Sequence, residues 1–171
     1  MSMDPASDLS VFLAYSLELE RESAERLREG AVIMRAHGQR SAAALLEQLS
    51  IYSDRHAEEI AEICEAHALP TLKPWDFVWP DAEPPETCDY ASMRYSMSDK
   101  EVLESMLGLE ERTAHFYRSV GCRSEKSDVQ QYAEQFAEEE LSHAQALRSM
   151  IAALSTGVHP APDIDPPREI D

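Results

Sequence analysis

A glutamate and a histidine spaced three residues apart are the most informative feature of this 171-residue chain, and they occur in Glu140-Leu141-Ser142-His143. Residues three apart on an α-helix lie on the same face, with their Cβ atoms roughly 5–6 Å apart. A carboxylate and an imidazole held in this way can bind one metal ion, and together they favour iron, manganese or zinc. The segment is therefore a candidate for part of a metal site.

A damaged second copy of this pattern lies in the first half of the chain, where Ser53 takes the place of the glutamate and His56 follows three residues later. The surrounding sequence repeats too: Glu47-Gln48-Leu49 matches Glu134-Gln135-Phe136 at an offset of 87, and Leu19-Glu20 matches Leu109-Glu110 at an offset of 90. Two helix pairs, each contributing a glutamate and then a Glu/His pair, describe a metal site inside a four-helix bundle.

Four long segments that must position these residues are predicted to be helical, in one all-α domain over residues 1–157. Glycine is scarce (5 residues) and strong helix formers dominate these segments. Helices are expected over about 8–37, 41–68, 98–121 and from 127 onward. Asp8 and the capping box Ser98-Asp99-Lys100-Glu101 mark two of the starts, and Gly38 and Gly121 mark two of the ends.

Residues 69–97 are predicted to be a long crossover between the second and third helices. Prolines at positions 70, 74, 80, 84 and 85 exclude regular helix, whereas Trp75, Phe77 and Trp79 are too apolar for a free linker. Such a connection lets the second and third helices of an antiparallel bundle run parallel. The proline-rich residues 158–171 are expected to be a mobile tail.

In each predicted helix a polar residue interrupts the apolar stripe, so these side chains should point into the core. The residues are Glu20, His56, Glu110, Glu140 and His143. Carboxylates buried without a partner are costly unless they are protonated or paired. No lysine or arginine lies on the same stripes, so metal cations are the natural partners of these carboxylates.

These residues, in this order and spacing, resemble the ferritin-like superfamily, and within it the rubrerythrin-like proteins, over residues 9–154. The resemblance implies that Glu20 and His56 are terminal ligands of one metal and that Glu110 and His143 are terminal ligands of the other. Glu140 would bridge the two ions. The family's second bridge falls at Ser53, so a site with one metal, or with two different metals, is an open alternative.

The same resemblance implies a non-haem iron oxidoreductase that reduces peroxide or dioxygen, with Glu140 and Tyr117 as catalytic residues and with a homodimer as the assembly. The chain lacks the cysteines of a rubredoxin domain, so a separate electron donor is expected. A glutamate typical of rubrerythrins is replaced by Thr113, which weakens the case for their specific peroxidase mechanism. Two alternatives stay open: a bundle that binds or stores metal without turnover, and a structural module with a decayed site.

The net charge is strongly negative, at −18 from 33 acidic and 15 basic residues. Binding to nucleic acid or to an anionic membrane surface needs positive charge, so we expect this protein to bind neither. Cys64, Cys88 and Cys122 are widely spaced and form no metal-binding pair, which indicates free thiols in a reducing compartment. The N-terminus lacks the basic region of a signal peptide, and a cytoplasmic location is expected.

Overall fold

The computed structural model describes residues 3–81, 84–86 and 97–155, and it is helical throughout its regular parts. The helices are α1 (Leu9–Ala36), α2 (Arg40–Cys64), α3 (Asp99–Arg123) and α4 (Ser127–Ser155), with a short 3-10 turn, η1 (Pro74–Asp76), after α2. The predicted tail, 158–171, and residues 87–96 of the crossover lie outside the described residues. The four-helix, all-α fold is confirmed.

The helix ends follow the local signals in the sequence, with two exceptions. Asp8 caps α1 by accepting a hydrogen bond from the Ser10 amide, and the Ser98/Glu101 capping box opens α3. Gly38 has φ +80°, a left-handed conformation that glycine adopts without strain. The first exception is α2, which ends at Cys64 rather than near residue 68, because the amides of residues 65–67 bond carbonyls three residues back before Pro70.

The second exception is Gly121, which does not end α3 but lies inside it. A Cβ atom added at this position would lie 3.2 Å from the Cβ of Ala133 on α4, tighter than an ordinary van der Waals contact. The glycine therefore allows α3 and α4 to approach closely near the turn that joins them.

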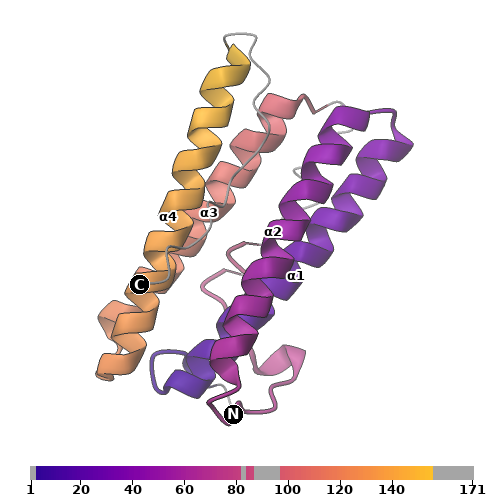
Figure 1. Ribbon diagram of the computed structural model, residues 1–171. Coiled ribbons are helices and arrows are strands. Elements are labelled where there is room, and N and C mark those ends of the chain that lie inside the picture. Colours follow the sequence, from indigo (N-terminus) through magenta and orange to yellow (C-terminus); the bar gives the residue numbers. More distant parts are fainter. Residues whose placement is uncertain (1–2, 82–83, 87–96, 156–171) are drawn as a thin grey trace.

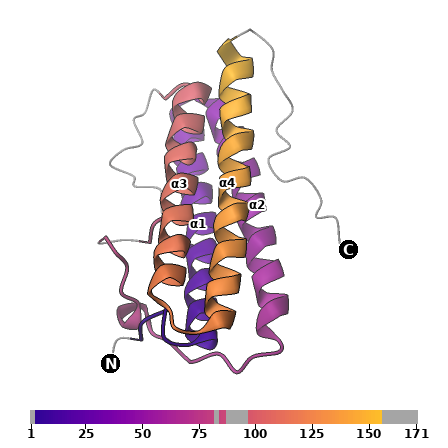
Figure 2. The ribbon, with the colours of Figure 1, turned by 90° about the vertical axis from the view of Figure 1, so that its left-hand side faces the viewer.

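The bundle consists of two helical hairpins, α1/α2 and α3/α4, that pack side by side (Figures 1 and 2). The chain leaves α2 at one end of the bundle and begins α3 at the other, so α2 and α3 run in the same direction (Figure 1). This arrangement confirms the predicted crossover. No helix in the described part of the chain is long and apolar enough to cross a membrane.

The hydrophobic core has two parts, one on each side of the middle of the bundle. Phe12, Tyr117 and Phe136 belong to the first cluster, and Leu46, Leu103 and Leu147 belong to the second. Along α4, Ala137 belongs to the first cluster and Leu147 to the second, and Glu140 and His143 lie between them. The candidate site residues thus form a polar layer between two apolar regions.

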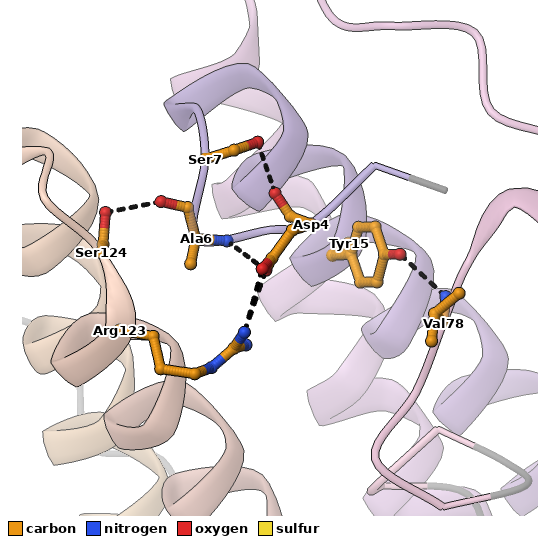
Figure 3. A network of polar contacts seen from close by, with 7 residues as sticks. All are labelled: Asp4, Ala6, Ser7, Tyr15, Val78, Arg123 and Ser124. Atoms are coloured by element: carbon orange, nitrogen blue, oxygen red, sulfur yellow. Dashed lines mark hydrogen bonds and ion pairs between the residues drawn. The ribbon is translucent and has the colours of Figure 1, made fainter. Parts of the chain in front are cut away.

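Polar contacts join the segment before α1 to the end of α3 (Figure 3). Asp4 accepts hydrogen bonds from the Ala6 amide (3.0 Å) and from Arg123 on α3 (3.0 Å), and Ser124 donates to the Ala6 carbonyl (2.7 Å). These contacts tie the segment before α1 to the end of α3, and they thereby join the first hairpin to the second.

The crossover is held against α1 by Tyr15, which is fully buried. Its hydroxyl accepts a hydrogen bond from the Val78 amide at 2.8 Å (Figure 3). Its ring lies 4.9 Å from that of Phe77 and 5.0 Å from that of Trp79, between centroids, in edge-on contacts. Phe77 and Trp79 therefore pack on the bundle, as the sequence predicts, whereas the prediction is wrong for Trp75, which is 75% exposed.

Replacing Tyr15 by phenylalanine is expected to lower the free energy of unfolding by about 1–2 kcal/mol, because the Val78 amide loses its acceptor. Chemical denaturation would measure this loss. The matched control is Tyr52→Phe, whose half-buried hydroxyl bonds Gln48 on its own helix and should matter less. Equal stabilities for Tyr15→Phe and wild type would contradict the anchoring role.

Candidate metal centre

The five side chains predicted to be metal ligands converge at mid-bundle. The Nδ1 atom of His56 lies 3.7 Å from Glu20 Oε1. The Nδ1 atom of His143 lies 3.2 Å from Glu140 Oε2 and 3.8 Å from Glu110 Oε2. The two imidazole rings, which come from different hairpins, stack with their centroids 4.4 Å apart. Each predicted pair of terminal ligands is therefore adjacent, although their role as ligands stays a prediction.

Two groups of possible metal ligands share one residue, Glu140. The first group is His56, Glu140 and His143, and the second is Glu20, Glu86 and Glu140. Within each group one donor atom from every residue lies within 4.8 Å of the others. Glu140 is thus shared by the two groups, whereas both histidines fall in the first group and Glu110 in neither, so the groups do not reproduce the predicted pairs of terminal ligands.

Glu86 is the residue that sequence reasoning missed. It lies in the crossover rather than on a helix, yet only 5% of its surface is exposed, and it faces Glu20 and Glu140. The signal in the sequence is weak: Glu86 directly follows Pro84-Pro85, in a segment without the helical spacing that marks the other site residues. The predicted count of three buried carboxylates at the centre was therefore incomplete.

The positions where this chain departs from the expected pattern hold small hydroxyl side chains. Ser53 is buried on the inner face of α2, and its Oγ lies 3.2 Å from that of Ser23 on α1. Thr113 is buried and donates to the Leu109 carbonyl of its own helix. Asp54, which follows Ser53, forms an ion pair with Arg28 on the outside of the bundle, so it does not replace the missing carboxylate.

A small cavity adjoins these residues on the Ser53 side of the centre. Its volume is about 20 Å³, enough for about one water molecule or ion. Ser23, Ser53, His56, Glu86, Glu110 and His143 all contribute to its lining. A water molecule or ion in this cavity would therefore contact both histidines and two of the carboxylates.

Burial, together with the crowding of carboxylates, raises the pKa of two of them well above the usual value. For Glu140 the causes are burial and then the charges of Glu110, Glu86 and Glu20. For Glu86 they are burial and the charges of Glu20 and Glu110, and a hydrogen bond with Ser23 lowers the pKa in part. Burial and the neighbouring negative charges thus favour the protonated form of both groups when no cation is present.

Contacts between the histidines and the carboxylates lower the pKa of Glu110 and raise the pKa of His56. Burial alone would raise the pKa of Glu110, but the hydrogen bonds and charge that His143 provides, with Glu140 and His56 contributing, lower it. Burial would lower the pKa of His56, but the adjacent carboxylate of Glu20, with further negative charges, raises it. The raised pKa of His56 favours its protonated form beside the Glu20 carboxylate.

Several carboxylate oxygens of the centre have no hydrogen-bond partner among the described residues although they are fully shielded from solvent. They belong to Glu20, Glu86 and Glu110. Among the described residues, the nitrogen atoms that lie within 4 Å of Glu20, Glu110 and Glu140 belong to His56 and His143 rather than to lysine or arginine. Oxygen and imidazole donors arranged in this way fit divalent metal ions, which would remove the cost of burying the carboxylates.

Tyr117 lies beside the same carboxylates. It is fully buried, and its hydroxyl has no hydrogen-bond partner among the described residues. Burial, followed by the charges of Glu20, Glu140 and Glu86, raises its pKa well above the usual value. The raised pKa keeps the hydroxyl protonated, and the carboxylate charges are close enough to affect that pKa. The Tyr117 ring makes edge contacts with the rings of Phe12 and Phe136.

The metal-free protein is expected to become less stable as the pH rises above about 4.5, the ordinary pKa of a glutamate. The pKa values of Glu86, Glu140 and His56 are raised in the folded state, so folding holds protons that the unfolded chain releases. The stability that these groups contribute is lost as the pH passes their folded-state values. The pKa of Glu110 is lowered in the folded state, so this group changes the stability only at pH values below about 4.5. Denaturation of chelator-treated protein across pH 5–8 measures the slope, and a rise in stability would contradict it.

The fold and the site together define a four-helix bundle with a buried carboxylate–histidine cluster suited to metal ions. No protein-family model matches the chain, and no curated protein matches it either. The chain is similar to an uncharacterised conserved protein from Magnetospirillum magnetotacticum MS-1, seen in a crystal structure, with 28% identity and a TM-score of 0.64. The alignment covers 92% of this chain and 99% of that one, so the likeness extends over the whole bundle.

Proposed function

We propose that this chain is a ferritin-like, rubrerythrin-type protein that binds two metal ions, iron in the first place, and reduces peroxide or dioxygen with them. The observation that carries the proposal is the convergence of five side chains from all four helices into one layer, in which Glu20, Glu140 and His143 are buried and His56 and Glu110 are partly buried. Evolution of a decayed site would leave apolar residues at such costly positions, whereas here every one of the five is polar.

Each side chain has a defined task in this proposal. Glu20 and His56 hold one ion, Glu110 and His143 hold the other, and Glu140, which belongs to both donor groups, joins them. Bound iron would supply Lewis acidity and electrons for the reduction. Reduction of hydrogen peroxide to two waters consumes two electrons and two protons, and the electrons come from a separate reductant, by class a small redox protein.

Tyr117 is proposed to provide a proton or a hydrogen bond to the reactant, because its hydroxyl is protonated, buried and close to the carboxylates. The apolar residues around it keep bulk water away from the reduced centre. The small volume beside Ser53 restricts the reactant to molecules of the size of peroxide or dioxygen.

The test begins with elemental analysis of anaerobically purified protein and of Glu140→Ala. We expect about two metal ions per wild-type chain and far fewer in the variant, with peroxide-dependent oxidation of the reduced protein only in wild type. Tyr117→Phe should keep its metal but turn over peroxide more slowly. Equal peroxide rates in wild type and Glu140→Ala would contradict the enzyme. Full metal occupancy without turnover would instead identify a metal-holding bundle.

A further inference from the structure

We propose that Glu86, supplied by the crossover, is a metal ligand that replaces the carboxylate missing from α2 at Ser53. This inference rests on the proposed metal centre and adds a sixth ligand to it. A helix that lost its own bridging residue would then be compensated by a non-helical segment that approaches the centre from outside the hairpins.

Burial and geometry both place Glu86 in the centre. It is 5% exposed, and a carboxylate oxygen lies within 4.8 Å of donor atoms from Glu20 and Glu140. Its Oε2 atom is shielded from solvent and has no hydrogen-bond partner among the described residues. A glutamate of the crossover that had no ligand role would be expected to point its carboxylate into water, since burying a carboxylate without a partner is costly.

Contacts on the crossover explain why Glu86 reaches the centre. The preceding residues, Pro84 and Pro85, have restricted backbone angles and so approach the bundle as a stiff segment. Arg112 on α3 donates a hydrogen bond to the Pro85 carbonyl at 3.3 Å. Because Arg112 lies two residues after Glu110 on α3, its hydrogen bond to Pro85 holds the crossover at the height of the site.

Space for the Glu86 carboxylate exists because position 53 is small. Ser23, Ser53 and Glu86 line the same cavity, and the Oγ atom of Ser23 lies 3.2 Å from that of Ser53. A glutamate at position 53 would extend from α2 into the volume that Glu86 borders. A glutamate carboxylate at position 53 and the carboxylate of Glu86 would thus compete for the same volume.

The charge balance is consistent with this replacement. Two divalent ions facing only Glu20, Glu110 and Glu140 would leave one net positive charge buried in the core. With Glu86 as a fourth carboxylate, the charges of ligands and ions cancel, which removes the cost of an unpaired buried charge.

The experiment compares metal binding by wild type, Glu86→Gln and the double variant Ser53→Glu/Glu86→Gln, using the full chain and ferrous or zinc ions. We expect Glu86→Gln to bind the second ion at least about tenfold more weakly, and the double variant to recover it. Elemental analysis gives the stoichiometry, and competition with a coloured chelator gives the affinities. Asp81→Asn, an exposed carboxylate on the same crossover, is the control for charge and should behave as wild type.

Each other result overturns part of the inference in a recognisable way. Unchanged binding in Glu86→Gln, with wild type holding its metal, shows that Glu86 is not a ligand and leaves the proposed function standing. An equal loss in Asp81→Asn shows that only overall charge matters. A double variant as weak as Glu86→Gln overturns the replacement of the α2 carboxylate. Absence of metal from wild type overturns both proposals together. Circular dichroism confirms that every variant is folded.

Discussion

Removing metal is expected to lower the unfolding temperature of wild type by roughly 10–20 °C, and Glu140→Gln is expected to abolish this difference. An ion present at a hundredfold excess over its dissociation constant stabilises the native state by about 2.7 kcal/mol, and the proposed centre binds two ions. For a chain of this size each kcal/mol shifts the unfolding temperature by about 2–4 °C. Glu140 is the residue common to both donor groups, so its loss affects both ions.

The same substitution should have the opposite effect on the metal-free protein. The Glu140 carboxyl is buried among Glu110, Glu86 and Glu20, and their charges raise its pKa. An amide at this position carries no charge at any pH and preserves the shape of the side chain. Metal-free Glu140→Gln should therefore be more stable than metal-free wild type at pH 8, where ionisation of the carboxyl costs most.

Calorimetry of all four samples, wild type and variant with and without metal, checks both halves of this prediction. Glu138→Gln is the matched control, because it removes an exposed carboxylate two residues away on the same helix. It should keep the full stabilisation by metal. Equal unfolding temperatures for loaded and metal-free wild type would contradict the prediction, since a ligand specific for the native state must raise stability.

The second large effect is expected from Phe12→Ala, which should lower the free energy of unfolding by about 3–5 kcal/mol. Phe12 on α1 is fully buried, and its ring contacts Tyr117 on α3 and Phe136 on α4, with centroids 5.8 Å and 5.7 Å apart. It thus links the first hairpin to the second. Its removal leaves a cavity between the hairpins that these rings cannot fill without moving.

The stabilisation by metal should nevertheless persist in Phe12→Ala. Phe12 precedes Glu20 by two helical turns, about 12 Å along the axis, and effects at such a separation usually add. Denaturant titrations with and without metal measure both quantities in the same samples. Phe12→Leu, which keeps most of the volume, is the control and should cost less than about 1.5 kcal/mol. A loss in Phe12→Ala as small as that of the control would show that the hairpins do not depend on this contact.

The sequence by itself determined the helices and the height of the site along them. Helical periodicity is local, so the register of Glu20, His56, Glu110, Glu140 and His143 could be predicted from their spacing against the apolar stripes. The repeat of two halves predicted two hairpins, and the prolines between them predicted a crossover. The helical register and the crossover depend on neighbours a few residues apart in the chain, and the repeat can be read directly by comparing its two halves.

Only the tertiary structure decided that Glu86 belongs to the centre. Its position depends on contacts with residues far away in sequence: Tyr15 with the aromatic part of the crossover, Arg112 with Pro85, and the space beside Ser53. No periodic pattern relates a non-helical segment to a helix face, so the direction of its side chain cannot be inferred from spacing. The sequence therefore predicted a gap at position 53, whereas packing across the bundle brought a carboxylate from the crossover into that gap.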